Sequence, residues 1–216
     1  MGTSRLERLA PLAGVVFGVV FVVALLTLGD TPDTDASGAE VISHYDDSGE
    51  VLLGVLALLL CGVLFLFFAG VLRARLRANG PEWLASVAFG GAVTYAVGLG
   101  IFAMSQFALL DASDLEQPEV AQALNILDND NFAPTVIGLA VVLLATAWHV
   151  LASRSLPVWV GWVSLVLGLL AVAGPLGFFA FLGFPLWVAA VAVVLFIGAR
   201  ADAIGAPAPD TARLPG

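Results

Sequence analysis

The chain contains no lysine, and its 216 residues carry eight arginines against 17 acidic residues, giving a formal net charge of −9. Nucleic-acid binding depends on a basic surface that faces the phosphates, so this composition excludes nucleic acid as a partner. Cysteine is almost as scarce, because Cys61 is the one cysteine and lies in an apolar run. A single cysteine excludes an intramolecular disulfide and any paired-cysteine redox or zinc site.

Charge of either sign is rare, at 12% of residues, whereas 60% of the residues are hydrophobic. Soluble globular domains carry about 25% charged residues. The composition therefore predicts an integral membrane protein. The polar segments are shorter than the ~50 residues that a folded soluble domain usually needs, so residues 1–216 form a single membrane domain.

Six apolar runs are long enough to cross about 30 Å of hydrocarbon at about 1.5 Å per residue. Each run lacks a charged residue in its middle, so we predict an all-α bundle of six transmembrane helices, followed by a flexible tail at 200–216. The alternative for the first run, a cleaved signal peptide, fits poorly because the small residues Ala36 to Gly38 lie too far beyond its end. The predicted spans are Pro11–Leu28, Val51–Leu72, Trp83–Leu109, Phe132–Leu151, Val158–Ala173 and Phe178–Ile197.

The arginines indicate the orientation of the bundle. If the six helices alternate in direction, every arginine falls on one side, and arginine-rich loops are typical of the cytoplasmic side. Four tryptophans near the same helix ends fit the aromatic belt of a membrane interface. We therefore expect a multi-pass protein of the plasma membrane with both termini cytoplasmic. The tryptophans are Trp83, Trp148, Trp159 and Trp162.

Two long outer loops, at 30–50 and 111–131, hold 13 acidic residues and no basic residue. After Pro118, apolar residues recur at helical spacing at Val120, Leu124 and Leu127, which predicts a short amphipathic helix lying on the outer membrane surface. Val41, Ile42 and Tyr45 indicate a shorter helix of the same kind in the first loop.

A weak divalent-cation site is one chemical hypothesis for these loops, because hard cations favour clustered carboxylates. The alternative is that the acids only solvate the outer face. No EF-hand pattern is present, and no other cofactor is predicted. The candidate ligands are His44, Asp46, Asp47, Asp128 and Asp130. The second histidine, His149, is expected at the opposite membrane surface as an interfacial residue, with a proton-sensing or ligand role as the alternative.

A few polar residues lie within the predicted spans. They predict either a shallow outward cavity or ordinary hydrogen bonds between helices. These residues are Thr94, Tyr95, Ser105, Gln106 and Thr135. Ser164 is the remaining candidate nucleophile, but no histidine or carboxylate is expected at its depth to activate it.

Two stretches resemble a known group of proteins. The residues from Pro118 to Asn125 with Leu127 to Asp130, and the Leu156-Pro157-Val158-Trp159-Val160-Gly161-Trp162 start of the fifth span, are similar to uncharacterised six-span actinobacterial membrane proteins of the domain-of-unknown-function type. The resemblance covers the layout of nearly the whole chain. It implies a membrane location and a six-helix architecture, and it supplies no functional residues.

These observations favour a non-enzymatic membrane protein that engages a protein partner, or a copy of itself, through its acidic outer loops. One alternative is a small transporter or channel component for a lipid-like or weakly polar solute, which would need the cavity named above. A second alternative is a membrane enzyme with a metal site on the outer face, which would need the acids around His44 to converge.

Overall fold

The computed structural model describes residues 9–46 and 48–205, and within these ranges the chain is helical with no strand. Each of the six predicted spans coincides with a helix. The elements in order are η1 (Ala10–Leu12), α2 (Ala13–Leu28), α3 (Gly38–Tyr45), α4 (Ser48–Ala78), α5 (Glu82–Asp114), α6 (Pro118–Asp130), α7 (Ala133–Ser153), α8 (Val158–Ala171), η2 (Gly174–Leu176) and α9 (Gly177–Gly205).

Five helical runs are long and apolar enough to cross a membrane. The runs are Ala10–Leu28, Gly49–Ala78, Glu82–Asp114, Pro118–Ser153 and Gly174–Arg200. The fourth run joins α6 to α7. The remaining apolar helix, α8, has 14 residues, which is about 21 Å at 1.5 Å per residue and shorter than the hydrocarbon layer. The fold is therefore that of a helical, multi-pass membrane protein.

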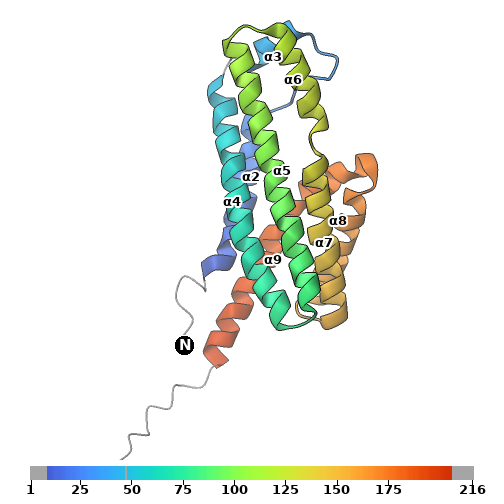
Figure 1. Ribbon diagram of the computed structural model, residues 1–216. Coiled ribbons are helices and arrows are strands. Elements are labelled where there is room, and N and C mark those ends of the chain that lie inside the picture. Colours follow the sequence, from blue (N-terminus) through green and yellow to red (C-terminus); the bar gives the residue numbers. More distant parts are fainter. Residues whose placement is uncertain (1–8, 47, 206–216) are drawn as a thin grey trace, which may run out of the picture.

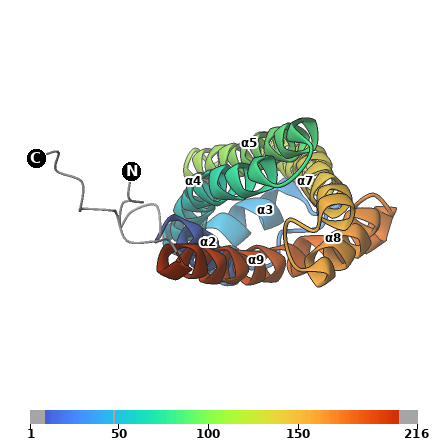
Figure 2. The same ribbon diagram turned by 90° about the horizontal axis from the view of Figure 1, so that it is seen from below.

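Five long helices and the shorter α8 form a closed ring, because α2 packs on α4, α4 on α5, α5 on α7, α7 on α8, α8 on α9 and α9 back on α2. Seen along the bundle, α4, α5 and α7 make one layer and α2, α9 and α8 make the other (Figure 2). Five of these contacts join ring helices that follow one another along the chain, and the contact between α9 and α2 closes the ring.

Aromatic side chains fill the middle of the ring. Phe184 stacks on Trp187 with ring centroids 5.5 Å apart. It also meets Phe65 at 5.3 Å and Tyr95 at 4.9 Å, both edge to face. Phe17, Phe65, Tyr95 and Phe184 have no exposed surface. Aromatic pairs in these geometries stabilise packing beyond the area they bury.

Glycines allow α5 and α7 to approach closely. A Cβ atom at Gly98 would lie 2.6 Å from the Thr135 backbone nitrogen, and one at Gly91 would lie 2.7 Å from that of Val142. By contrast, Gly90 and Gly100 on the same helix face open space. Only part of the glycine content of α5 therefore serves packing within the chain.

One end of the molecule extends beyond the ring. Figure 1 shows α3, α6 and the adjoining ends of α4 and α5 above the level at which α8 turns into α9. We call this part, residues 29–46, 48–53 and 104–131, the cap. Helix α6 was expected to lie flat on the membrane, but it continues the direction of α7 after a break at Asn131 and Phe132 (Figure 1). Its contacts with α3 and α5 hold it upright.

The opposite end carries the arginines of α4 and α9 and the arginine that directly follows α7. We call it the arginine end. Its described arginines are Arg73, Arg75, Arg77, Arg154 and Arg200.

The glycine packing generates a prediction within one helix. Gly98→Ala should destabilise the protein by about 1–3 kcal/mol, because the new methyl group would force α5 and α7 apart. Gly100→Ala is the control and should leave stability unchanged or raised, since alanine favours helix and nothing lies in its way. Thermal unfolding of the two variants in detergent would measure the difference. Equal unfolding temperatures would contradict the close approach.

Candidate functional site

The cap begins with α3, whose start is specified by a capping box. The Ser37 side chain accepts a bond from the Glu40 backbone nitrogen, while the Ser37 backbone nitrogen donates to the Glu40 carboxylate at 2.7 Å. Donation from the Ser37 backbone and hydroxyl groups lowers the pKa of Glu40. The helix then directs Val41 and Tyr45 inward, and both are buried.

A chain of hydrogen bonds joins α3, α5 and α6 inside the cap. Tyr45 Oη donates to Gln106 Oε1 at 3.1 Å, and Gln106 Nε2 donates to Asp128 Oδ2 at 2.8 Å. The Ser105 hydroxyl donates to Asp128 Oδ1. Asn131 Nδ2 donates to Ser105 Oγ at 2.9 Å. We call these five residues the cap network.

The carboxyl group of Asp128 is the centre of this network. Asp128 is 4% exposed. Its polar contacts are the three donors Ser105, Gln106 and Asn131, and no described residue forms an ion pair with it. Burial and, second, the negative charge of Asp128 raise the pKa of Tyr45, so this phenol stays protonated and remains a donor. A buried acid held in this way is costly to leave unpaired, so the network fixes α6 against α5.

Asparagines on α6 hold the loop that leads into the cap. Asn125 is fully buried, and its side-chain amide donates to the carbonyls of Pro32 at 3.3 Å and Asp33 at 2.9 Å. Asn129 adds a bond to the Pro32 carbonyl at 3.2 Å. The loop after α2 is therefore held by α6, in addition to its local bond from the Ala36 nitrogen to the Asp33 carbonyl.

The predicted helix in the second loop exists as α6, and its inward face is partly polar. The buried residues of α6 are Ala121, Asn125 and Asp128. Of the apolar residues that we expected on the membrane-facing side, Val120 and Leu127 are 45% and 58% exposed, whereas Leu124 is half-buried against the cap. Polar residues took the inward face because α5 offers Ser105 and Gln106 as partners there.

The five predicted cavity residues do not come together. Ser105 and Gln106 belong to the cap network, whereas Tyr95 lies in the aromatic centre of the ring and its hydroxyl has no partner. Thr135 packs at Gly98, and Thr94 bonds back to the Gly90 carbonyl at 3.1 Å. None of the five lines either of the two pockets described below.

The predicted cation ligands are also dispersed. His44 and Asp46 are exposed on α3, Asp130 is exposed at the end of α6, and Asp128 is committed to the cap network. Asp47 lies outside the described residues. Among those that are described, no three His, Cys, Asp or Glu side chains lie close enough to hold a metal ion. The cation site stays a prediction without supporting geometry.

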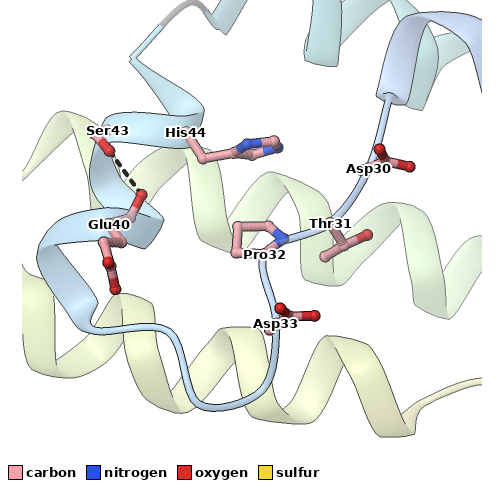
Figure 3. A pocket seen from close by; sticks show the side chains of 7 residues that line it. All are labelled: Asp30, Thr31, Pro32, Asp33, Glu40, Ser43 and His44. Atoms are coloured by element: carbon pink, nitrogen blue, oxygen red, sulfur yellow. Dashed lines mark hydrogen bonds between the residues drawn. The ribbon is translucent and has the colours of Figure 1, made fainter.

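An open pocket of about 700 Å³ lies on the cap between the loop after α2 and α3 (Figure 3). Its side chains come from residues that the sequence reasoning had not grouped. They are Asp30, Thr31, Pro32, Asp33, Glu40, Ser43 and His44. Figure 3 shows the carboxylates of Asp30 and Asp33 pointing away from the His44 ring, so the acids surround the pocket and do not converge on one atom. We call it the acidic pocket.

Acids cover the rest of the cap surface. Twelve of the 13 acids in the outer loops are described; of these, Asp128 turns inward and the other eleven are exposed. The exposed acids are Asp30, Asp33, Asp35, Glu40, Asp46, Glu50, Asp111, Asp114, Glu116, Glu119 and Asp130. Apolar side chains stand among them, since Leu115, Val120 and Leu127 are 66%, 45% and 58% exposed.

At the arginine end, His149 is not the interfacial residue that we expected. Its side chain is fully buried beneath the α4–α5 loop, and its ring is close to Gly80. Nδ1 lies 3.1 Å from both Ser153 Oγ and Ser155 Oγ.

In the ring of helices, Ser164 accepts a bond from Trp187 Nε1 at 2.9 Å, so it serves α8–α9 packing.

Comparison of the chain with family models, with curated proteins and with solved structures finds no match. The resemblance to six-span actinobacterial proteins stays a prediction.

The two tyrosines of the chain provide a matched test of the cap network. Tyr45→Phe removes the donor to Gln106 and should lower the free energy of unfolding by about 0.5–1.5 kcal/mol. Tyr95→Phe removes a buried hydroxyl that has no partner, so stability should be unchanged or slightly raised. Denaturation of both variants in the same detergent would measure this. A loss that is larger for Tyr95→Phe would contradict the assigned network.

Proposed function

We propose that the protein is a six-span plasma-membrane protein whose cap is a docking surface for a basic segment of a partner protein. The observation that carries this proposal is the acidic pocket, set among eleven exposed acids on a cap whose described residues include no arginine or lysine. Complementary charge steers association and selects partners. The exposed Leu115, Val120 and Leu127 supply apolar contact area beside the charges.

The rigidity of the cap supports a binding role. A surface that is already ordered loses less conformational freedom on binding than one that must fold at that moment. The cap network fixes α6 to α5, and Asn125 and Asn129 hold the loop that lines the acidic pocket. The pocket therefore exists before a partner arrives.

The contacts favour docking over transport. A path through the ring of helices would pass Phe65, Tyr95 and Phe184, which are buried and in mutual contact. The polar residues that would line an outward cavity are used in hydrogen bonds or packed against α5 and α7. Catalysis at an outer metal site has no grouped ligands to support it among the described side chains.

The proposed topology places the cap outside and the arginine end in the cytoplasm, with α8 as the fifth span. The connection of α8 to α9 near the level at which α6 meets α7 supports this arrangement (Figure 1). The segregation of arginines at the other end supports the orientation. Because α8 is short, it crosses only if the bilayer thins or the flanking residues extend its reach.

Cysteine labelling tests this topology, since the native Cys61 is buried. A membrane-impermeant maleimide should label Glu119→Cys on the cap of intact cells. It should label Asn79→Cys, in the α4–α5 loop, and a cysteine added after Gly216 only once the membrane is opened. A terminal cysteine labelled from outside, with Asn79→Cys protected, would mean that α8 does not cross.

Docking is tested by placing a photoreactive amino acid at Ser43, which is exposed in the acidic pocket. We expect one discrete crosslinked species, weakened by high salt because exposed charges are screened. The matched position is Leu186, which is 72% exposed on α9 and should give only lipid or background adducts. An adduct of twice the mass of the chain identifies a second copy as the partner.

The charge dependence of the crosslink has its own control. Asp30→Asn combined with Asp33→Asn should reduce the Ser43 adduct several-fold, whereas Asp30→Glu combined with Asp33→Glu should retain it. An adduct that is no stronger at Ser43 than at Leu186, or that ignores neutralisation of the two aspartates, would contradict the proposed function.

A further inference from the structure

A second pocket, of about 490 Å³, lies at the arginine end on one face of α4. Its residues recur at spacings of three and four, which places them on adjacent turns of a single helical face. They are Gly70, Arg73, Ala74, Arg77 and Ala78. Two guanidinium groups one turn apart thus alternate with side chains no larger than a methyl group. Gly70 faces open space, so the pocket continues along the helix beyond Arg73.

The positive charge of this face is only partly neutralised within the chain. Arg77 pairs with Glu82 at 2.8 Å, and both side chains are more than half exposed. Arg73 forms no ion pair with any described residue. Its guanidinium carbon lies 5.3 Å from the centre of the Phe89 ring, and its Nε is buried without a hydrogen-bond partner. Like charges at this spacing on a helix repel each other, so an anion between them would relieve a cost.

The depth of the pocket points to the membrane interface. Trp83 and Trp148 are exposed and meet edge to face at 5.6 Å, and tryptophans in such positions mark the headgroup region. Trp83 adjoins Glu82, the partner of Arg77. Arg73 precedes Arg77 by four residues on α4, so it lies about 6 Å nearer the middle of the bundle than Arg77 does. Its guanidinium therefore lies where phosphate and glycerol groups replace bulk water.

We propose that this pocket binds an anionic glycerophospholipid. The phosphate lies between the guanidinium groups of Arg73 and Arg77, and one acyl chain runs along Gly70 and Ala74. Arginine suits the task because its planar fork donates two parallel bonds to a phosphate and because it stacks on an aromatic ring, as Arg73 does on Phe89. Basic pockets beside membrane helices are favourable sites for anionic headgroups. The inference rests on the membrane placement of the chain and is independent of partner docking at the cap.

Native mass spectrometry of the full-length chain in mild detergent tests the proposal. The probes are phosphatidylglycerol and phosphatidylcholine with the same acyl chains. We expect one phosphatidylglycerol to be retained in preference to phosphatidylcholine. Combining Arg73→Gln with Arg77→Gln should weaken that binding about tenfold or more, since charge-assisted hydrogen bonds are lost. Arg200→Gln is the matched control, because Arg200 lies over Phe196 at the same end but does not line the pocket.

Two further variants separate the pocket from general charge attraction. Ala74→Leu keeps both arginines but fills the pocket, and it should weaken retention as well. Glu82→Gln removes the carboxylate that competes for Arg77, so phosphatidylglycerol should bind more tightly. Thermal unfolding in lipid-free detergent checks that every variant is folded.

Equal retention of the two lipids by the unmodified chain overturns the proposal. So does a loss in Arg200→Gln as large as that of the double variant, and so does undiminished binding to Ala74→Leu. Unchanged or weaker binding to Glu82→Gln would remove Arg77 from the site. Failure of any of these tests leaves the crosslink at Ser43 unaffected, because the two sites lie at opposite ends of the molecule (Figure 1).

Discussion

Contact among large aromatic side chains at the centre of the helical ring is the interaction on which the rest of the molecule depends. A ring of helices in lipid has no hydrophobic driving force to close it, because the surrounding chains are as apolar as the helix surfaces. Phe184 and its neighbours Phe65, Tyr95 and Trp187 supply dispersion contacts that lipid cannot replace. They fill the centre of the ring, while the glycines of α5 and α7 allow those two helices to approach closely.

Because aromatic side chains fill the centre of the ring, most polar side chains with hydrogen-bond partners lie at the two ends of the molecule. Backbone groups are satisfied within each helix, and the side chains that need partners are found mostly where the helices leave the ring. In the cap, the carboxyl group of Asp128 accepts hydrogen bonds from three donors and has no ion-pair partner among the described residues. At the arginine end, the guanidinium groups of Arg73 and Arg200 lie over aromatic rings, and the buried His149 lies between two serines. The two ends therefore differ in the sign of their charge and in the contacts that stabilise it, which are hydrogen bonds in the cap and aromatic rings at the arginine end.

The helices could be predicted because their signal is local. An apolar run of sufficient length has few alternatives in a membrane, so all six predicted spans match observed helices. The cap network could not be predicted, because Asp128 meets Ser105 and Gln106 across 23 and 22 residues of chain. Ser105 and Gln106 were predicted as cavity residues and Asp128 as a cation ligand, because residue type alone does not show which side chains are in contact. The orientation of α6 was missed for a related reason, since apolar spacing identifies an apolar face but not which face finds a partner.

The bonds from Asn125 to the carbonyls of Pro32 and Asp33 have a consequence for biosynthesis. They join positions 93 and 92 residues apart, on either side of the two longest helices. A chain that enters the membrane from its N-terminus exposes the loop after α2 long before α6 has been made. That loop therefore gains these bonds only after α4, α5 and α6 have been made, which is about half of the bundle. A chain that stops before α6 would lack the amide donors that hold this loop, so the pocket depends on a segment made about 90 residues later.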